Sequence, residues 1–186
     1  MIRLGRVEIT GGFLLLAAWL NYLDRSFLVP EAMLACALHE LGHYLAIRLL
    51  GGDVKIIRLT AIGAEMVLDR PLGYWQEGLS ALAGPGVNLL LALLACGWED
   101  GLVFAGLNLA LALFNLAPMG RLDGGRVLYC VLALLFGPGL AGWAGRWLDR
   151  ICTAALLGAG LILAGIGNFT LLMAAIWLLA ALRRPN

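Results

Sequence analysis

The stretch ACALHELGHYLAIR, residues Ala35–Arg48, combines an apolar helical pattern with the residues of a metal site. Its H-E-x-x-H motif is formed by His39, Glu40 and His43, and it contains both histidines of the chain. Residues four apart share one face of a helix, so the two imidazoles can bind one metal ion beside the Glu40 carboxylate. The alternative is two ordinary core histidines, but it leaves a charged Glu40 in an apolar helix at a cost of several kcal/mol. We therefore predict a metal site.

The composition is that of a membrane protein. Of the 186 residues, 62% are hydrophobic and 13% are charged, and the mean hydropathy is +0.91. Soluble domains have about 25% charged residues, so we predict an all-α polytopic membrane protein in which residues 1–186 form a single domain. The net charge is +1, and we expect no nucleic-acid partner. The four cysteines occur singly in apolar segments, which argues against a disulfide framework or a cysteine zinc site.

We expect six transmembrane helices, since a helix needs about 20 residues to cross a bilayer. A basic start precedes the first, as in a signal peptide, but no cleavage site follows, so we expect this helix to be retained. The last two are short and are alternatively one bent segment. Nearly all Lys and Arg residues then fall on one side, which predicts a multi-pass cell-membrane protein with both termini cytoplasmic. The expected spans are 10–28, 31–50, 78–98, 102–136 with a break at 118–121, 151–166 and 169–182.

The sequence between the second and third spans indicates a short β-hairpin. The segment DVKIIRLTAIGAEMVLD, residues 53–69, is rich in β-branched residues and has a glycine near its middle. This pattern is typical of two strands that turn around Ala61–Ala64, although an ordinary juxtamembrane loop has similar propensities. A hairpin would leave an unpaired edge that can bind an extended peptide as an added strand.

A third metal ligand is expected, because a catalytic zinc site usually has three protein ligands and one open position. Asp123 lies in an apolar segment between Pro118 and Gly124-Gly125, which break the fourth helix. Broken helices at membrane depth are tolerated where they line a cavity, so Asp123 is the best candidate ligand. Its alternative role is to cap the second half of the helix.

Two amides in the apolar spans, Asn88 and Asn115, also need hydrogen-bond partners. They can either bond to each other's backbone or donate to a substrate carbonyl near the metal. The sequence does not decide between these two roles.

The combined motifs resemble the site-2 proteases, which are intramembrane zinc metalloproteases. The residues that carry the resemblance are His39-Glu40-Leu41-Gly42-His43, Ala83-Gly84-Pro85-x-x-Asn88 and Asn115-x-x-Pro118-x-x-x-Leu122-Asp123-Gly124. The short six-span form is similar to the sporulation-type branch, which releases a sigma factor from its pro-sequence. Arg121 stands where many members have a second proline, and we expect no PDZ-like insertion or CBS-type nucleotide-binding module.

The resemblance implies that His39, His43 and Asp123 bind one Zn²⁺ and that Glu40 is the general base. It also implies that the re-entrant hairpin presents an edge to the substrate, with Ile62 and Gly63 at its turn, and that Asn88, Asn115 and Pro118 contribute to substrate binding. The expected activity is hydrolysis of a peptide bond of a membrane-associated protein, under the control of a membrane inhibitor or regulator.

Two other functions are considered. One is a metal-binding membrane protein that is not an enzyme, either a transporter or a catalytically inactive relative that binds transmembrane helices. Such a protein would spread polar residues over several spans as an ion path, whereas here they gather on the second and fourth. The other is a zinc protease whose third ligand is a downstream glutamate, but Glu65, Glu77 and Glu99 all lie outside the expected spans.

Overall fold

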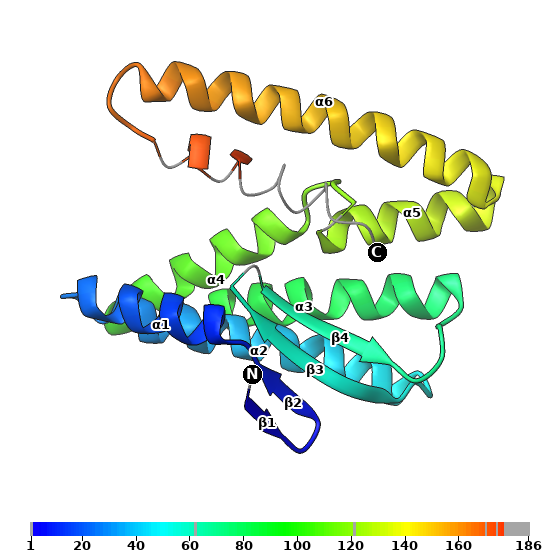
Figure 1. Cartoon of the computed structure of the whole chain (residues 1–186), viewed down its shortest axis with the longest axis horizontal. Helices are drawn as coiled ribbons and strands as arrows, with labels where there is room; N and C mark the ends of the chain where they lie inside the picture. The colour runs from blue at the N-terminus through cyan, green and yellow to red at the C-terminus, as the bar shows by residue number, and fades with distance from the viewer. Residues whose placement is uncertain (1, 62, 121, 170, 174, 177–186) are drawn as a thin grey trace.

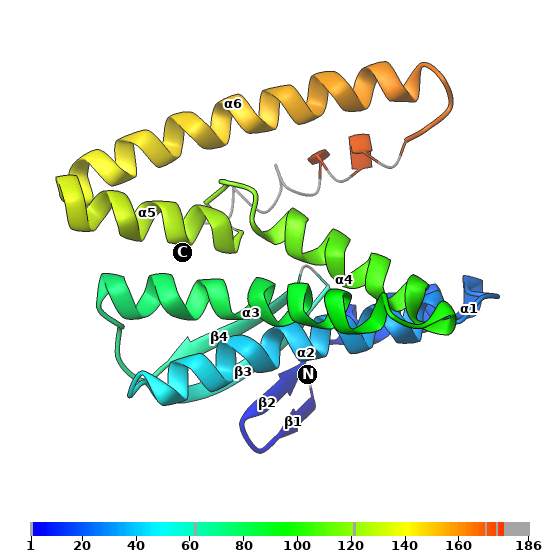
Figure 2. The same ribbon diagram turned by 180° about the vertical axis from the view of Figure 1, so that it is seen from behind.

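The computed structural model describes residues 2–61, 63–120, 122–169, 171–173 and 175–176. Its helices pack side by side, with a small sheet on one side of the molecule and the longest helix on the other (Figures 1 and 2). The helices are α1 (Gly11–Leu23), α2 (Leu28–Leu49), α3 (Tyr74–Ala95), α4 (Leu102–Asn115), α5 (Asp123–Phe136) and α6 (Pro138–Ala164). The strands are β1 (Ile2–Leu4), β2 (Val7–Ile9), β3 (Val54–Thr60) and β4 (Gly63–Leu68).

The predicted hairpin between the second and third helices is confirmed, but it belongs to a larger sheet. The strand order is β1-β2-β3-β4, with β2 parallel to β3 and the other pairs antiparallel. The expectation of an all-α fold is therefore wrong at the N-terminus, where a second hairpin precedes α1. Strands of three residues are too short to show a period in the sequence, and the pairing of β2 with the distant β3 stabilises this hairpin.

The first two helices begin and end differently from the predicted spans. The first is shorter than expected and ends at Leu23, and α2 begins at Leu28, so that Pro30 lies in its first turn. The cause is Asp24, whose carboxylate accepts hydrogen bonds from the backbone N–H groups of Val29 at 2.8 Å and Ser26 at 3.0 Å. These bonds, led by that of Val29, lower the pKa of the Asp24 carboxyl.

The predicted break in the fourth span is confirmed. Helix α4 ends at Asn115, and α5 begins at Asp123 after a connection that contains Pro118. The predicted fifth span is wrong at its start, because α6 begins at Pro138 rather than near Ile151. Gly137, with φ of 86°, makes the tight turn that directs α6 back along α5. Most of the predicted sixth span, 169–182, lies outside the described residues.

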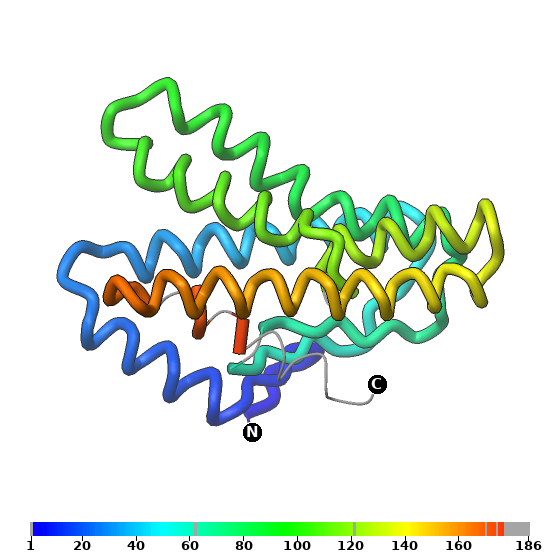
Figure 3. Tube along the Cα trace, turned by 90° about the horizontal axis from the view of Figure 1, so that it is seen from above, coloured from blue at the N-terminus to red at the C-terminus, as the bar shows by residue number. Residues whose placement is uncertain are grey.

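Helix α3 packs against α2, α4 and α5, and the long α6 runs across the molecule on the side from which Figure 3 is seen. Within the described residues, α3 and α6 are the helices long and apolar enough to cross a membrane by length and composition. Leucines along several helices are exposed, which suits an apolar solvent. These features agree with a membrane protein, and the expected count of six spans goes beyond them.

Candidate metal centre

The H-E-x-x-H motif lies in the middle of α2, where it forms one buried face. His39 and His43 are 5% and 6% exposed, and their rings meet edge to face with centroids 4.6 Å apart. This separation follows from the four-residue spacing on a helix. Their Nε2 atoms are 3.0 Å apart and point into the same space.

Asp123 completes the group from the first turn of α5. Its Oδ2 atom lies 3.1 Å from His39 Nε2 and 3.1 Å from His43 Nε2, and the residue is 7% exposed. Two glycines allow this approach, because a Cβ on Gly124 would meet the backbone of Leu116 and Ala117, and one on Gly125 would meet Met119. The break in the fourth span thus brings the carboxylate to α2.

Helix α3 supports both imidazoles from behind. His43 Nδ1 lies 2.7 Å from the backbone oxygen of Ser80, and His39 Nδ1 lies 2.5 Å from Oδ1 of Asn88. A carbonyl oxygen can only accept, so His43 donates from Nδ1 and turns Nε2 toward Asp123. A Cβ on Gly84 would overlap the His43 ring, so this position admits only glycine without displacement of His43.

The three inward-facing atoms suit a single metal ion. One ligand atom from each of His39, His43 and Asp123 lies within 4.8 Å of the others. Ligands about 2.0–2.1 Å from a tetrahedral zinc ion are separated by about 3.3 Å, close to the distances of 3.0 and 3.1 Å found here. An imidazole lone pair and a carboxylate oxygen facing one another at this distance repel unless a cation or proton lies between them.

A cavity of about 350 Å³ opens beside this group. Glu40 and Asn115 line it together with the His-His-Asp group, and Gly63 and its neighbours in β4 form another part of its wall. Helix α2 and the predicted peptide-binding strand therefore face the same space, although they are separated in the sequence by a loop and a strand.

Only some of the residues predicted to bind substrate line the metal cavity. Gly63 and Asn115 line the cavity. Asn88 is completely buried behind His39, with its amide engaged by protein groups, so its position does not favour a substrate contact. It is also not paired with the backbone of Asn115, whose Nδ2 donates to Leu111. Pro118 is exposed on the connection before α5 and lines a different cavity. Ile62 lies outside the described residues.

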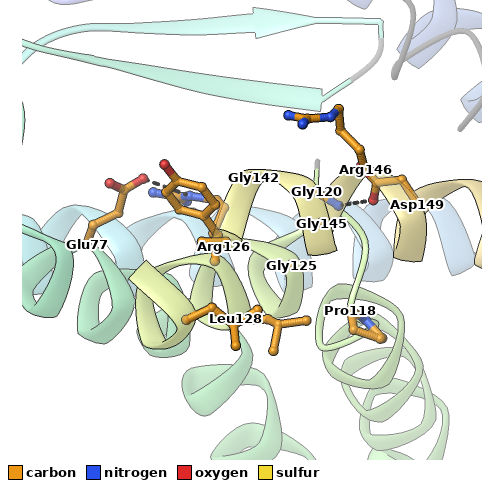
Figure 4. A pocket seen from close by; sticks show the side chains of 13 residues that line it. Glu77, Pro118, Gly120, Gly125, Arg126, Leu128, Gly142, Gly145, Arg146 and Asp149 are labelled. Atoms are coloured by element: carbon orange, nitrogen blue, oxygen red, sulfur yellow. Dashed lines mark hydrogen bonds and ion pairs between the residues drawn. The ribbon is translucent and has the colours of Figure 1, made fainter. Parts of the chain in front are cut away.

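Sequence reasoning missed several polar residues around the site. Arg126 lies one turn after Asp123, with Nη1 3.4 Å from Asp123 Oδ1 and Nε 3.7 Å from Glu77 Oε1. It borders both the metal cavity and a second one, of about 500 Å³, that also includes Pro118 (Figure 4). The three-residue spacing from Asp123 was the available signal. Asn108, which contacts Asn88, lies in an apolar helix without a motif.

A solved structure has the same fold. The site-2 protease from Methanocaldococcus jannaschii matches with a TM-score of 0.71 over 96% of this chain and 90% of that chain, at 23% identity. The fold is therefore that of a site-2 protease.

Sequence comparison finds related proteins, although no protein-family model matches the chain. A curated protein of Synechocystis that is named as a zinc metalloprotease is 34% identical over 142 residues, covering 70% of this chain and 36% of that protein. A zinc metalloprotease of Methanocaldococcus jannaschii is 30% identical over 111 residues, covering 54% of this chain and 32% of that protein. The matches thus span about a third of these relatives' length. Together with the fold, they support the site-2 protease family and confirm the resemblance that the motifs predicted.

Proposed function

We propose that this chain is a zinc-dependent intramembrane protease that hydrolyses a peptide bond in or near a membrane segment of another protein. The observation that carries the proposal is the convergence of His39 Nε2, His43 Nε2 and Asp123 Oδ2 within 3.1 Å of one another, in a cavity that Glu40 also lines. The names of the two relatives agree with this chemistry.

The proposed zinc ligands are His39, His43 and Asp123. Two imidazoles and one carboxylate form a usual ligand set for catalytic zinc and leave a fourth position open. A zinc ion held there supplies a Lewis acid, which polarises the scissile carbonyl and makes an attacking water more acidic.

Glu40 is the proposed general base. It follows His39 directly on α2 and borders the cavity that the three ligands share. From this position its carboxylate accepts the proton of the attacking water and then delivers it to the leaving amine. The peptide bond is broken with the addition of one water molecule, and Glu40 returns to its starting state.

The outer edge of β4 is the proposed binding site for the substrate backbone. In the described sheet β4 is the last strand, and its residues Gly63–Met66 line the metal cavity. A substrate helix has its amides in internal hydrogen bonds, so it must unwind before cleavage, and strand pairing replaces the lost bonds. We place Asn115 next to the bound peptide, since it lines this cavity as well.

The first experiment measures zinc and proteolysis in detergent-purified protein. We expect about one zinc per chain in the wild type, loss of that zinc in Asp123→Ala, and retained zinc without cleavage in Glu40→Gln. The substrates are a panel of single-span reporter proteins in liposomes. Full cleavage by Glu40→Gln would refute the general-base assignment. A folded wild type without metal would favour the alternative, an inactive protein that binds transmembrane helices.

We also propose six spans with both termini cytoplasmic, in a single domain that acts on a membrane-tethered precursor such as that of a transcription factor. The topology predicts that Lys55 lies inside and Asp100 outside. In a cysteine-free background, a membrane-impermeant maleimide applied to intact cells should label Asp100→Cys and not Lys55→Cys. Glu40→Gln should retain uncleaved substrate on purification, together with any regulator, and a lack of membrane-associated partners would count against this substrate class.

A further inference from the structure

Two buried asparagines connect the metal site to a helix that contributes no ligand. Asn88 on α3 and Asn108 on α4 are both completely buried, and Nδ2 of Asn88 donates to Oδ1 of Asn108 at 2.7 Å. Asn88 Nδ2 also donates to the backbone oxygen of Ala35 on α2, at 3.3 Å. Asn108 Nδ2 donates to the backbone oxygen of Phe104 at 2.9 Å.

These contacts determine which group donates and which accepts in each hydrogen bond of this side-chain network. The backbone oxygen of Phe104 can only accept, so the amide nitrogen of Asn108 faces it and Oδ1 faces Asn88. Asn88 must then present Nδ2 to Asn108, and its Oδ1 is left facing His39 Nδ1 at 2.5 Å. An amide oxygen accepts, so a proton lies on Nδ1 of His39, and Nε2 is the ring nitrogen that faces Asp123 and His43.

We propose that Asn88 and Asn108 are positioning residues that hold His39 in the Nδ1–H tautomer with Nε2 turned toward the metal. The part that concerns zinc rests on the proposed function, whereas the tautomer follows from the protein contacts. Outer partners of this kind fix the orientation of a ligating histidine and raise its affinity for metal.

The two histidines differ in how they are held. His43 donates to a backbone oxygen, that of Ser80, which remains in place when the Ser80 side chain is substituted. His39 depends on two side chains, Asn88 and Asn108, from two other helices. The amide pair therefore couples the packing of α3 and α4 to one ligand on α2. A substitution of Asn108 in α4 should change metal binding although Asn108 contacts none of the three ligands.

The test uses Asn88→Leu, Asn108→Leu and the double variant, with Thr153→Val as the control. Thr153 is 6% exposed on α6, and its hydroxyl finds no partner among the described residues, so the control removes a buried polar group elsewhere. Zn²⁺ affinity is measured by competition with a chelator, and the tautomer by nitrogen NMR of metal-free protein with labelled histidine. The chain has two histidines, which makes both rings assignable through His43→Gln.

We expect Asn88→Leu to lower Zn²⁺ affinity about 10–100-fold and to remove the fixed Nδ1–H state of His39. Asn108→Leu should lower Zn²⁺ affinity less and loosen the same Nδ1–H state. The double variant should resemble Asn88→Leu, because Asn108 acts on His39 through its hydrogen bond to Asn88. Thr153→Val should change neither measurement. Thermal unfolding of the metal-free variants shows whether a variant is still folded, so that a change in the His39 tautomer can be distinguished from loss of the fold.

Unchanged affinity and tautomer in folded Asn88→Leu would overturn the proposal, as would losses for Asn88→Leu and Asn108→Leu that simply add. Failure of the proposed function gives a different result. If the wild type binds no zinc, the metal assignment fails, while a mixed His39 tautomer in metal-free wild type refutes the positioning role and a fixed Nδ1–H state supports it.

Discussion

At the scale of single residues, the site requires glycines where a larger side chain would collide with a ligand or with a neighbouring helix. His43 occupies the space that a Cβ at Gly84 would take, and a Cβ at Gly42 of α2 would lie 2.9 Å from the backbone oxygen of Ala83. Close contact between α2 and α3 is what allows Ser80 to accept the hydrogen bond of His43. Small residues at helix contacts permit this approach in membranes.

We predict that Gly84→Ala displaces the His43 ring and lowers Zn²⁺ affinity about 10-fold or more, since the ligand loses its backbone partner. Gly86→Ala is the matched control on the same helix, where a Cβ meets nothing within 4 Å. Chelator competition on both variants provides the measurement. Equal affinities would mean that His43 tolerates a shift and that the glycine is not required by the site.

At the scale of elements, the break between α4 and α5 allows the fourth span to place a carboxylate on α2. The first turn of α5 packs so closely on the preceding connection that a Cβ at Gly125 would overlap the backbone of Met119 and come within 2.7 Å of Gly120. Met119 and Leu122 are buried and hold this connection in place, with Cys152 and Leu156 of α6 packed against them.

Gly125→Ala should therefore destabilise the protein by about 1–3 kcal/mol, the usual cost of overpacking, and should release zinc because Asp123 moves with its turn. Gly139→Ala, at an open position in α6, should be neutral or stabilising by about 0.5–1 kcal/mol. Chemical unfolding in detergent and zinc content check both. A stable, zinc-loaded Gly125→Ala protein would contradict this account of the break.

The hydrogen-bond directions in the sheet show which residues of β4 face its open edge. The backbone N–H of Ile57 donates to the backbone oxygen of Arg6, and the backbone oxygen of Leu59 accepts from the N–H of Thr10. The backbone N–H and C=O groups of odd-numbered β3 residues therefore point to β2. Arg58, opposite Glu65, must then face β4, and Glu65 faces back toward it. The N–H of Met66 consequently points to the open edge.

Met66→Pro should therefore lower the cleavage rate while zinc content and the β3–β4 pairing remain, because it removes an N–H that faces the open edge of the described sheet and is available to a bound peptide. Met66→Ala keeps that N–H and controls for the lost side chain. The backbone N–H of Val67 faces β3, so Val67→Pro should disrupt the hairpin itself. Faster hydrogen exchange of the hairpin amides would show this. Cleavage at the wild-type rate by Met66→Pro would argue against substrate pairing along this strand.

At the scale of the whole molecule, the first residues of the chain are joined to the hairpin beside the site. Glu8 of β2 is 7% exposed, and its carboxylate lies 3.1 Å from Arg58 Nε and 3.9 Å from Arg3 Nε. Arg58 also reaches the exposed Glu65 of β4, at 3.6 Å. A charged row thus crosses the sheet from the N-terminal hairpin to the strand that lines the cavity.

We expect Glu8→Gln to weaken the attachment of the N-terminal hairpin by about 1–3 kcal/mol, because it removes the charge from a buried hydrogen bond. Glu65→Gln, which loses an exposed pair with the same arginine, should change stability by less than about 1 kcal/mol. Faster hydrogen exchange of β2 and β3 amides in Glu8→Gln alone is the expected result. Equal effects of the two substitutions would show that burial of Glu8 contributes nothing.

The sequence by itself determined the helical class, the metal-ligand candidates, the β3–β4 hairpin and the break before Asp123. These features rest on local rules: four-residue spacing on a helix, helix-breaking glycine and proline, and β-branched residues around a turn. The tertiary structure alone decided that β1 and β2 extend the sheet and that Asn88 contacts His39 and Asn108 rather than the open cavity. These features depend on which groups meet across helices and strands far apart in the chain, and no local pattern in the sequence carries that information.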